Sequence, residues 1–255
     1  MGLQYVFMDE TLRQRFISQW QKYFPNAELP ITWYYTDQPP DTSATSGSEH
    51  CLISRMNIVR EGHPLVYSAR TPGCLGGKRH TGFSTKLRPN FEYFLSCGIP
   101  GKLEGERYKK SPDLVSAQLS EHPSFTAPGQ YLVFKRWDML GSQEDPFVAV
   151  FFATPDVLSG LFTLANYDLA TTQGVIAPFG SGCSTVVAYP LEETSKQQRC
   201  ILGMFDVSAR PSVQPEVLSF AVSIQRLRVM LDNMDESFLI TSSWKAVQHR
   251  TLTVS

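Results

Sequence analysis

Three of the five cysteines lie in backbone settings that favour the ionised form of a thiol. Cys183 follows Ser181, a predicted helix N-cap, and Cys51 lies in the first turns of another predicted helix. Cys74 lies in a Pro-Gly-Cys-Leu-Gly-Gly turn. Because the unpaired amides at a helix start carry partial positive charge, a thiol near them has a lowered pKa and is a better metal ligand. The pattern therefore predicts a site lined by thiolates.

Glycines accompany two of these cysteines. Gly76 and Gly77 follow Cys74, and Gly182 precedes Cys183. Without a side chain, glycine lets backbone amides approach a cluster sulfide or an oxyanion closely. Three thiolates from separate segments are enough to hold a cubane iron–sulfur cluster with one open iron. The predicted cofactor-binding residues are Cys51, Cys74, Cys183, Gly76, Gly77 and Gly182, with the three cysteines as metal ligands.

The open iron would accept substrate, water or a further ligand. His50 and His80 are the candidates for that ligand because they lie near Cys51 and Cys74 in the sequence. The chain has no C-x-x-C pair, so such a site would exist only in the folded protein. The remaining cysteines, Cys97 and Cys200, are better explained as small hydrophobic residues that fill a core.

Two hypotheses without a metal stay open. The turn from Gly73 to Gly77, followed by Lys78 and Arg79, has the glycines and cations of an anion-binding nest, which favours a small-molecule binding or regulatory module. It matches neither P-loop nor Rossmann spacing. The other hypothesis is a thiol redox protein, in which two of the three cysteines have Cα atoms within about 7 Å. The sequence contains neither the G-x-S-x-G nor the H-E-x-x-H signature of hydrolases.

The composition is that of a globular protein large enough to bury a sizeable core. Of its 255 residues, 42% are hydrophobic and 18% are charged, and the formal net charge is −1. This balance gives no overall attraction to nucleic acid or to an anionic membrane. The sequence shows no signal-peptide pattern and no apolar run of about 18 residues. We therefore expect a cytoplasmic protein with reduced cysteines, and neither nucleic acid nor a membrane as its partner.

The N-terminal half alternates helix and strand signals. Apolar residues at helical spacing predict a helix from about Asp9 to Phe24, and β-branched and aromatic residues predict a strand at 31–35. A polar loop is expected at 37–48, and Ser46 and Glu49 have the spacing of a capping box for a helix at 51–59. Further expected elements are a strand at 65–68, a turn at 71–78 and helices at 91–96 and 112–120.

The C-terminal half has a clearer rhythm. Two short strings, P-D-V-L-S at 155–159 and P-E-V-L-S at 215–219, are nearly identical, and each has proline and an acidic residue where a helix can begin. They raise the hypothesis of an internal strand–helix duplication. The expected elements are strands at 131–137, 147–153, 174–178 and 200–205, and helices at 155–167 and 215–231.

Three motifs in this order resemble the uncharacterised ArCR family, domain of unknown function 169. They are Cys51 at a helix start, the Cys-Leu-Gly-Gly turn at Cys74, and the Pro-Phe-Gly-Ser-Gly-Cys segment that ends at Cys183. The resemblance spans about residues 11 to 232, and the last motif is the most specific. The family carries no established activity, so the resemblance implies a pattern, in which the three cysteines form one site, and no reaction.

Together these patterns predict a single α+β domain over residues 1–255, with a mixed sheet built from two strand–helix halves and flanked by helices. The cysteines are expected to meet in a cleft between the halves. The leading hypothesis is a cysteine-ligated iron–sulfur or soft-metal protein with redox or Lewis-acid chemistry on a small molecule, and whether it is an enzyme is left open. Its expected partner is a small molecule or a redox protein.

Overall fold

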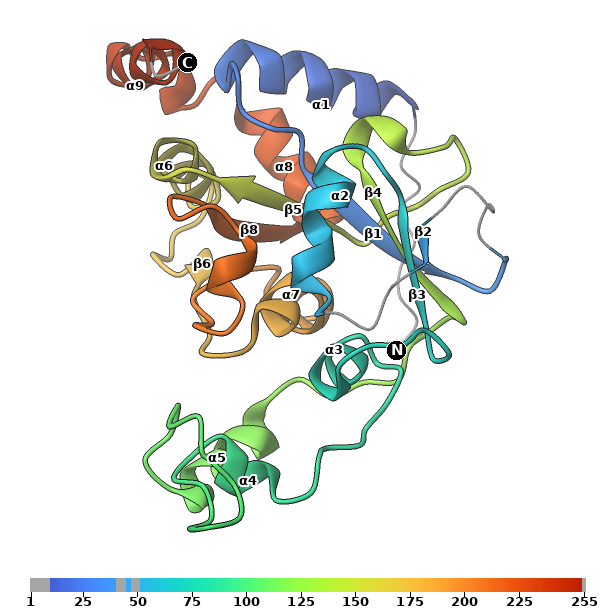
Figure 1. Cartoon of the computed structure of the whole chain (residues 1–255). Helices are drawn as coiled ribbons and strands as arrows, with labels where there is room; N and C mark the ends of the chain where they lie inside the picture. Colours follow the sequence, from blue (N-terminus) through green and yellow to red (C-terminus); the bar gives the residue numbers. More distant parts are fainter. Residues whose placement is uncertain (1–9, 40–44, 47–50, 254–255) are drawn as a thin grey trace.

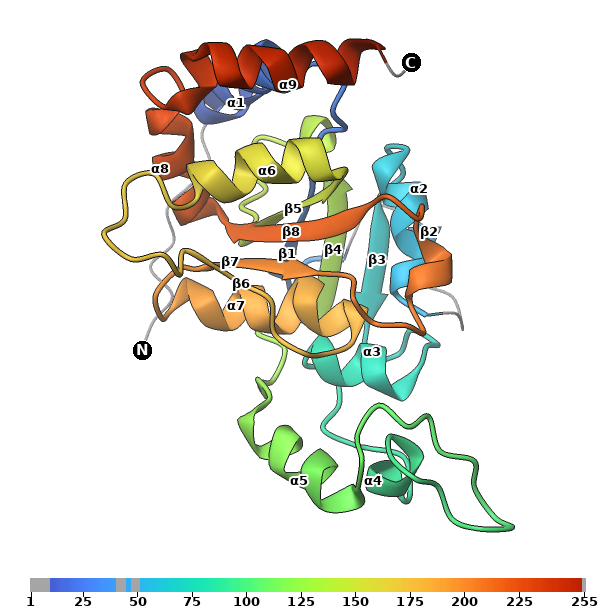
Figure 2. The same cartoon turned by 90° about the vertical axis from the view of Figure 1, so that its left-hand side faces the viewer.

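The structure is a computed structural model that describes residues 10–39, 45–46 and 51–253. Within this part of the chain, eight strands form one mixed sheet in the order β2-β3-β4-β1-β5-β8-β7-β6. Helices cover both faces of the sheet, so the fold class is α+β, as the sequence predicts (Figures 1 and 2). The strands are β1 (Ile31–Thr36), β2 (Thr45–Ser46), β3 (Leu65–Ser68), β4 (Tyr131–Arg136), β5 (Val148–Ala153), β6 (Val175–Ile176), β7 (Cys200–Gly203) and β8 (Leu218–Ser223).

The centre of the sheet is the antiparallel pair β1–β5, in which Ile31 lies opposite Val150. All six residues of β5 are buried. Val148 and Val150 pack into the core on one face of the sheet, and Ala149 and Phe151 pack into the core on the other. A strand that is apolar on both faces must be covered on both, which explains the two helical layers.

One layer of helices packs on the face of the sheet that we call the α1 face, and the other packs on the α2 face. Within the described residues, no helix is both long and apolar enough to cross a membrane. The α1 face is covered by α1 (Glu10–Tyr23), α6 (Pro155–Leu164), α8 (Ile224–Asn233) and α9 (Ser242–Thr253). The α2 face carries η1 (Ile53–Arg55), α2 (Met56–Arg60), η3 (Ser184–Ala188) and α7 (Tyr189–Thr194), with α3 (Leu75–His80) against η3. Three short 3-10 turns complete the set: η2 (Trp137–Met139), η4 (Arg210–Ser212) and η5 (Phe238–Ile240).

The α1 face is held by aromatic packing. The buried residues of α1, Phe16, Trp20 and Tyr23, are spaced on one side of the helix, as the sequence pattern predicts. The Trp20 ring lies 4.3 Å from that of Phe24 and 4.9 Å from that of Phe151 on β5. Truncating a buried aromatic side chain of this kind costs about 3–5 kcal/mol, so this contact fixes α1 on the sheet.

The two halves of the sheet have the same topology. In the first half, β1 pairs with β4 and β4 with β3, both antiparallel, and β3 pairs with β2 in parallel. In the second half, β5 pairs with β8, β8 with β7 and β7 with β6 in the same senses. The order of the sheet is therefore that of one four-stranded unit repeated about the β1–β5 pair. The predicted mixed sheet of two halves is confirmed.

The two strings that suggested a duplication do not occupy equivalent places. The first opens α6, as predicted, but the second forms a turn that leads into β8. The predicted helix at 215–231 is therefore wrong, because α8 begins only at Ile224. β8 pairs with β5 over all six residues, and its apolar side chains enter both cores, so tertiary packing decides in favour of a strand.

Two other expectations need correction or fall outside the described residues. The predicted turn at 71–78 contains the start of α3, for which Cys74 is the N-cap. The predicted polar loop at 37–48 includes the two-residue strand β2, while residues 40–44 and 47–50 lie outside the described part of the chain. The capping box with Glu49 lies there as well.

A helical arm, residues 84–126, is inserted between α3 and β4. It contains the two predicted helices, α4 (Phe91–Phe94) and α5 (Pro112–Glu121), which pack against each other. Figures 1 and 2 show the arm projecting from the body beyond α3 and α7. At its base the amide of Ala127 donates a hydrogen bond of 2.9 Å to the carbonyl of Gly82, which closes the insertion.

Candidate functional site

The three predicted cysteine ligands come from three loops on the α2 face. Cys51 lies just before η1, Cys74 is the N-cap of α3, and Cys183 is the residue directly before η3. α3 packs against η3. A Cβ placed on Gly182 would lie 3.0 Å from Ile53 of η1, so the loops of Cys51 and Cys183 are also in close contact.

The thiols interact with one another. Cys51 donates a hydrogen bond to Cys74, which lowers the pKa of Cys74 and raises the pKa of Cys51. Burial and the charge of Cys74 raise the pKa of Cys183, and the charge of Cys183 in turn raises the pKa of Cys51. Such couplings act at short range in a partly buried site. The structure thus brings the three predicted ligands into one group.

Cys74 is the ionised member of this group. Its pKa is lowered to about 6, first by the hydrogen bond from Cys51 and then by backbone amides that include those of Gly77 and Gly76, against the effect of burial. The Gly77 amide donates to Cys74 Sγ at 3.1 Å. A Cβ on Gly77 would lie 3.3 Å from that sulfur, so glycine allows the close approach. Cys74 is also exposed, so the group opens to solvent there.

Cys183 is the buried member. Only 5% of its surface is exposed, and burial raises its pKa to about 12, although Ser181 Oγ lies 3.3 Å from its sulfur. Ser181 Oγ also accepts from the Ser184 amide at 3.4 Å, which agrees with the predicted N-cap. The Gly182 amide donates to Asp206 Oδ2 at 3.0 Å. The amide of Gly182 therefore fixes the cysteine loop to the loop after β7.

Tyr67 on β3 is a site residue that the sequence pattern did not reveal. Its side chain is fully buried, and among the described residues its hydroxyl has no hydrogen-bond partner. Burial, followed by the charges of Cys74, Cys51 and Cys183, raises its pKa to about 12. The hydroxyl thus lies within electrostatic reach of all three thiols. The signal that could have found it is strand alternation, since Tyr67 shares the inward face of β3 with Leu65.

His80 belongs to a separate cluster at the base of the arm. Its ring lies 4.7 Å from that of His122, which lies 4.9 Å from that of Tyr189. Burial lowers the pKa of His80 to about 3 and also lowers the pKa of His122. A histidine before proline in a polar turn is typical of a solvated loop residue, but the stack with its two neighbours buries His122. The other candidate, His50, lies outside the described residues.

The two cysteines assigned to packing differ from each other. Cys200 on β7 is fully buried in the core, as expected. Cys97 is exposed in the arm, so the packing role predicted for it is wrong. Its neighbour Gly98 has a φ of 74°, a left-handed conformation that favours glycine, and an added Cβ there would clash with the backbone of Leu103.

Three interacting thiols are a donor set of the kind that soft metals and iron–sulfur clusters take. In the described part of the chain, no group of three or more His, Cys, Asp or Glu side chains is arranged to hold a single metal ion. The unpartnered hydroxyl of Tyr67 is a donor of the kind that cluster sulfides accept.

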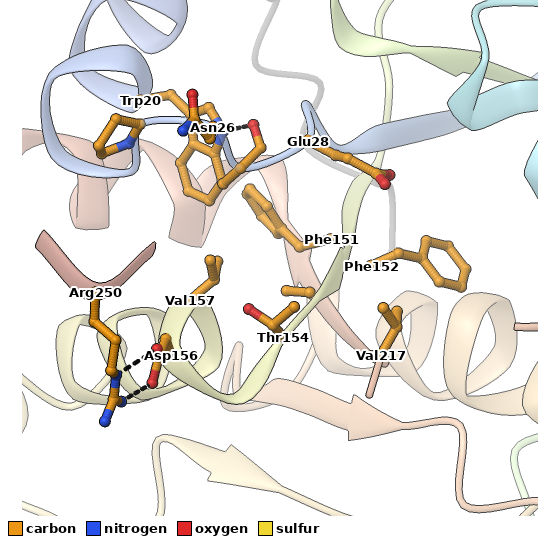
Figure 3. Close-up of a pocket in the computed structure, with 13 residues that line it drawn as sticks. Trp20, Asn26, Glu28, Phe151, Phe152, Thr154, Asp156, Val157, Val217 and Arg250 are labelled. Carbon is orange, nitrogen blue, oxygen red and sulfur yellow. Dashed lines mark hydrogen bonds and ion pairs between the residues drawn. The ribbon is translucent and has the colours of Figure 1, made fainter. Parts of the chain in front are cut away.

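No cysteine lines either of two cavities, both of which lie within the described residues. A cavity of about 320 Å³ lies between α1, the end of β5 and the start of α6, where Trp20, Phe151 and Val157 form apolar walls (Figure 3). At its rim Arg250 forms a salt bridge with Asp156. A second cavity, of about 510 Å³, lies beside the base of the arm. The thiol group is a separate place on the α2 face.

Comparison with protein-family models shows the family to which the chain belongs. The model of the family described as uncharacterised ArCR, domain of unknown function 169, matches residues 23–233, which include all three cysteines of the group. No curated protein and no solved structure matches the chain. With a match over most of its length, the chain belongs to the uncharacterised ArCR family.

Proposed function

We propose that this protein holds an iron–sulfur cluster, or another soft metal centre, with Cys51, Cys74 and Cys183 as its ligands. The observation that supports this most strongly is the interaction of three thiols from three separate segments of the chain. Thiolates are the ligands that soft metals and iron–sulfur clusters take. Five free cysteines without a C-x-x-C pair suit a centre that only the fold assembles.

The electrostatics of the group favour a cation. Without one, Cys183 is kept neutral by burial and by the neighbouring charge on Cys74. A metal centre binds the deprotonated thiols and cancels the repulsion among them, and it releases their protons as it binds. The affinity of the site for metal is therefore expected to rise with pH through the range in which these thiols titrate.

A cluster suits the surroundings better than a single ion. The hydroxyl of Tyr67 and the amide of Gly77 are hydrogen-bond donors beside the thiols. Three cysteine ligands leave one iron of a cubane cluster open, and the exposed side of Cys74 gives that position access to solvent. When bound, such a centre would supply one-electron redox chemistry or Lewis-acid activation of a small molecule.

The anion-binding alternative finds less support in the same contacts. It needs free amides and free cations in the turn before α3. The Gly77 amide donates instead to Cys74 Sγ, Lys78 Nζ donates to the carbonyl of Ala69, and Arg79 donates to the carbonyl of Thr85. These groups are engaged with the protein itself, so the thiolate centre is the better proposal. Stabilisation by organic phosphates and none by iron in a thermal-shift assay would reverse that order.

One contact favours a thiol redox protein as a second candidate. The hydrogen bond between Cys51 and Cys74 places a thiol beside a thiolate, which is the starting geometry for disulfide formation. Mild oxidation of the metal-free protein with diamide is then expected to link these two cysteines. Peptide mapping under non-reducing conditions detects the link, and metal-loaded protein should resist it.

The test of the main proposal is anaerobic purification and reconstitution with iron and sulfide. The wild-type protein is expected to gain iron, sulfide and a charge-transfer absorption band. Two pairs of variants control for general damage. Cys183→Ser is compared with Cys200→Ser, since both residues are buried, and Cys74→Ser is compared with Cys97→Ser, since both are exposed.

Only the first member of each pair should lose the centre. A wild-type protein that stays colourless, without iron, sulfide or zinc after reconstitution, would refute the proposal. Equal loss in Cys97→Ser or Cys200→Ser would also refute the assignment of the ligands, because neither residue touches the thiol group.

A further inference from the structure

The charged residues of the chain are distributed unevenly. Between residue 70 and the end of the arm at residue 126, the chain has nine of its 23 Lys and Arg residues and five Asp or Glu residues, so this stretch has a net charge of +4 in a chain of net charge −1. Within the described residues, none of these nine cations forms a salt bridge. Ten of the fourteen cations elsewhere do. We call these nine side chains the basic surface.

The basic surface lies beside the thiol group. It begins at Arg70, between β3 and α3, and continues along the arm, which Figures 1 and 2 place next to α3 and α7. The arm touches both loops that hold Cys183. Lys109 Nζ lies 4.6 Å from the ring centre of Phe179, and Tyr108 hydrogen bonds to Ser208 in the turn that begins at Asp206.

Apolar side chains are exposed near the arm and the thiol group. Phe179 is 59% exposed, Val207 is 69% exposed, and Leu75, directly after Cys74, is also exposed. Large apolar residues in a setting of unpaired cations match the anatomy of a protein interface, with an apolar centre and a charged rim.

We propose that the basic surface docks an electron-carrier protein that presents an acidic face. This inference rests on the proposed redox centre. In the transfer, the reduced carrier loses one electron and the centre gains it, with no bond made or broken and no proton moved. The cations of the arm, which form no salt bridge within the described residues, would steer the acidic face toward the opening at Cys74, and this attraction weakens as salt screens it.

The composition of the surface favours a protein over nucleic acid. Glu92, Glu104 and Glu106 interrupt the run of cations, which would repel a continuous phosphate backbone. Two of the cationic groups are held over aromatic rings, Lys109 over Phe179 and Arg88 over Phe94 at 3.9 Å. A protein partner can place its carboxylates around these fixed points, whereas a duplex cannot.

The experiment measures binding of three probes to the reconstituted full chain at low and at physiological salt. The probes are an acidic plant-type ferredoxin, a basic cytochrome c and a 20-base-pair DNA duplex. Lys102→Glu and Lys110→Glu reverse exposed, unpaired charges on the arm, and Lys245→Glu reverses an exposed charge on α9, which lies at the other end of the molecule (Figure 1). Iron and sulfide are assayed on every sample.

The acidic ferredoxin is expected to bind more tightly at low salt, and each arm variant is expected to weaken it by about three- to ten-fold. The Kd for binding of the ferredoxin to Lys245→Glu should lie within error of the Kd for the wild type. Tighter binding of the duplex or of cytochrome c, no binding of the ferredoxin, or equal loss in Lys245→Glu would overturn the docking proposal. If wild-type protein holds no iron and sulfide after reconstitution but still binds the ferredoxin, the docking surface is upheld and the metal centre is refuted. The two proposals therefore fail separately.

Discussion

The two halves of the sheet share a topology but contribute differently to the thiol group. Cys51 and Cys183 are equivalent in position, because each lies at the helix start between an edge strand and its parallel neighbour. The loops that follow differ. After β3 the chain supplies Cys74, a thiolate, whereas after β7 it supplies Asp206, whose carboxylate holds the Gly182 amide. One half thus provides two sulfurs, and the other provides one sulfur and the support for it.

The ends of β3 and β7, which lead into these two loops, also contribute differently to the thiol group. Tyr67 pairs with Leu132, the second residue of β4, and Gly203 pairs with Ser219, the second residue of β8, so the two positions correspond. Tyr67 places its hydroxyl among the thiols, whereas the missing side chain of Gly203 makes room for Thr185 in η3. A repeated fold therefore yields one asymmetric site, and four measurements test this comparison.

The largest effect on stability is expected at Gly203. A Cβ added there would lie 2.3 Å from Thr185 Oγ1, so Gly203→Ala must displace η3, which directly follows Cys183. Overpacking of this kind costs about 1–3 kcal/mol, measured as the free energy of unfolding in urea. Gly141→Ala is the control, because its Cβ would meet nothing closer than 3.5 Å. An unchanged free energy of unfolding in Gly203→Ala would show that the two halves tolerate a side chain at this position equally.

A smaller loss is expected when the support of Cys183 is removed. Asp206 accepts from the Gly182 amide at 3.0 Å, and from the Ser208 amide at 3.0 Å and its hydroxyl at 2.8 Å. Asp206→Ala should reduce stability by about 1–2 kcal/mol and slow reconstitution of the centre. Asp37→Ala is the matched change in the first half, because it removes one hydrogen bond, from the Gln130 amide. Equal effects of the two variants would contradict the supporting role of Asp206.

The arm occurs only in the first half, and His80 at its base makes stability depend on pH. Because burial lowers the pKa of His80 to about 3, the unfolded chain binds a proton on this residue as pH falls below about 6.5 while the folded chain does not. Stability from this residue is complete above pH 6.5 and is lost toward pH 3. The urea midpoint of His80→Phe should fall less steeply over this range than that of wild type. An unchanged slope, or an equal change in exposed His63→Gln, would contradict this reading.

The smallest effect on stability is expected at Tyr67, where the change should appear instead in the properties of the proposed redox centre. The hydroxyl has no partner among the described residues, so Tyr67→Phe should alter the unfolding free energy of the metal-free protein by less than about 0.5 kcal/mol. Loss of a donor to the cluster should make the reduction potential more negative. Tyr131→Phe on β4 is the control. An unchanged potential would remove Tyr67 from the site.

The sequence predicted elements where local periodicity and packing agree. The apolar side of α1 and the continuous apolar run of β5 are examples. It failed at 215–231, because a proline followed by an acidic residue suits a turn as well as a helix start, and only pairing with β5 decides between them. The repeat of strand order was also hidden, since it belongs to hydrogen-bond partners that lie far apart in the chain.

The candidate site, like the fold, could be predicted from the sequence only where the signal is local. The settings of Cys51, Cys74 and Cys183 were readable because helix starts and glycine turns are local features. Their mutual contact depends on topology, as does the position of Tyr67, whose neighbours come from three other segments. The burial of His122 also depends on topology, since a polar turn before proline gives no sign of the rings that bury it.

The central claim is that three cysteines from both halves form one centre, and differential alkylation tests it most directly. Iodoacetamide labelling at pH 7 of metal-free protein should modify Cys74 and Cys97 first, because Cys74 has a pKa of about 6 and both are exposed. After reconstitution with iron and sulfide, mass spectrometry should find Cys51, Cys74 and Cys183 protected together, with Cys97 labelled as before. Protection of only one of the three, or continued labelling of Cys74 in iron-loaded protein, would contradict the account.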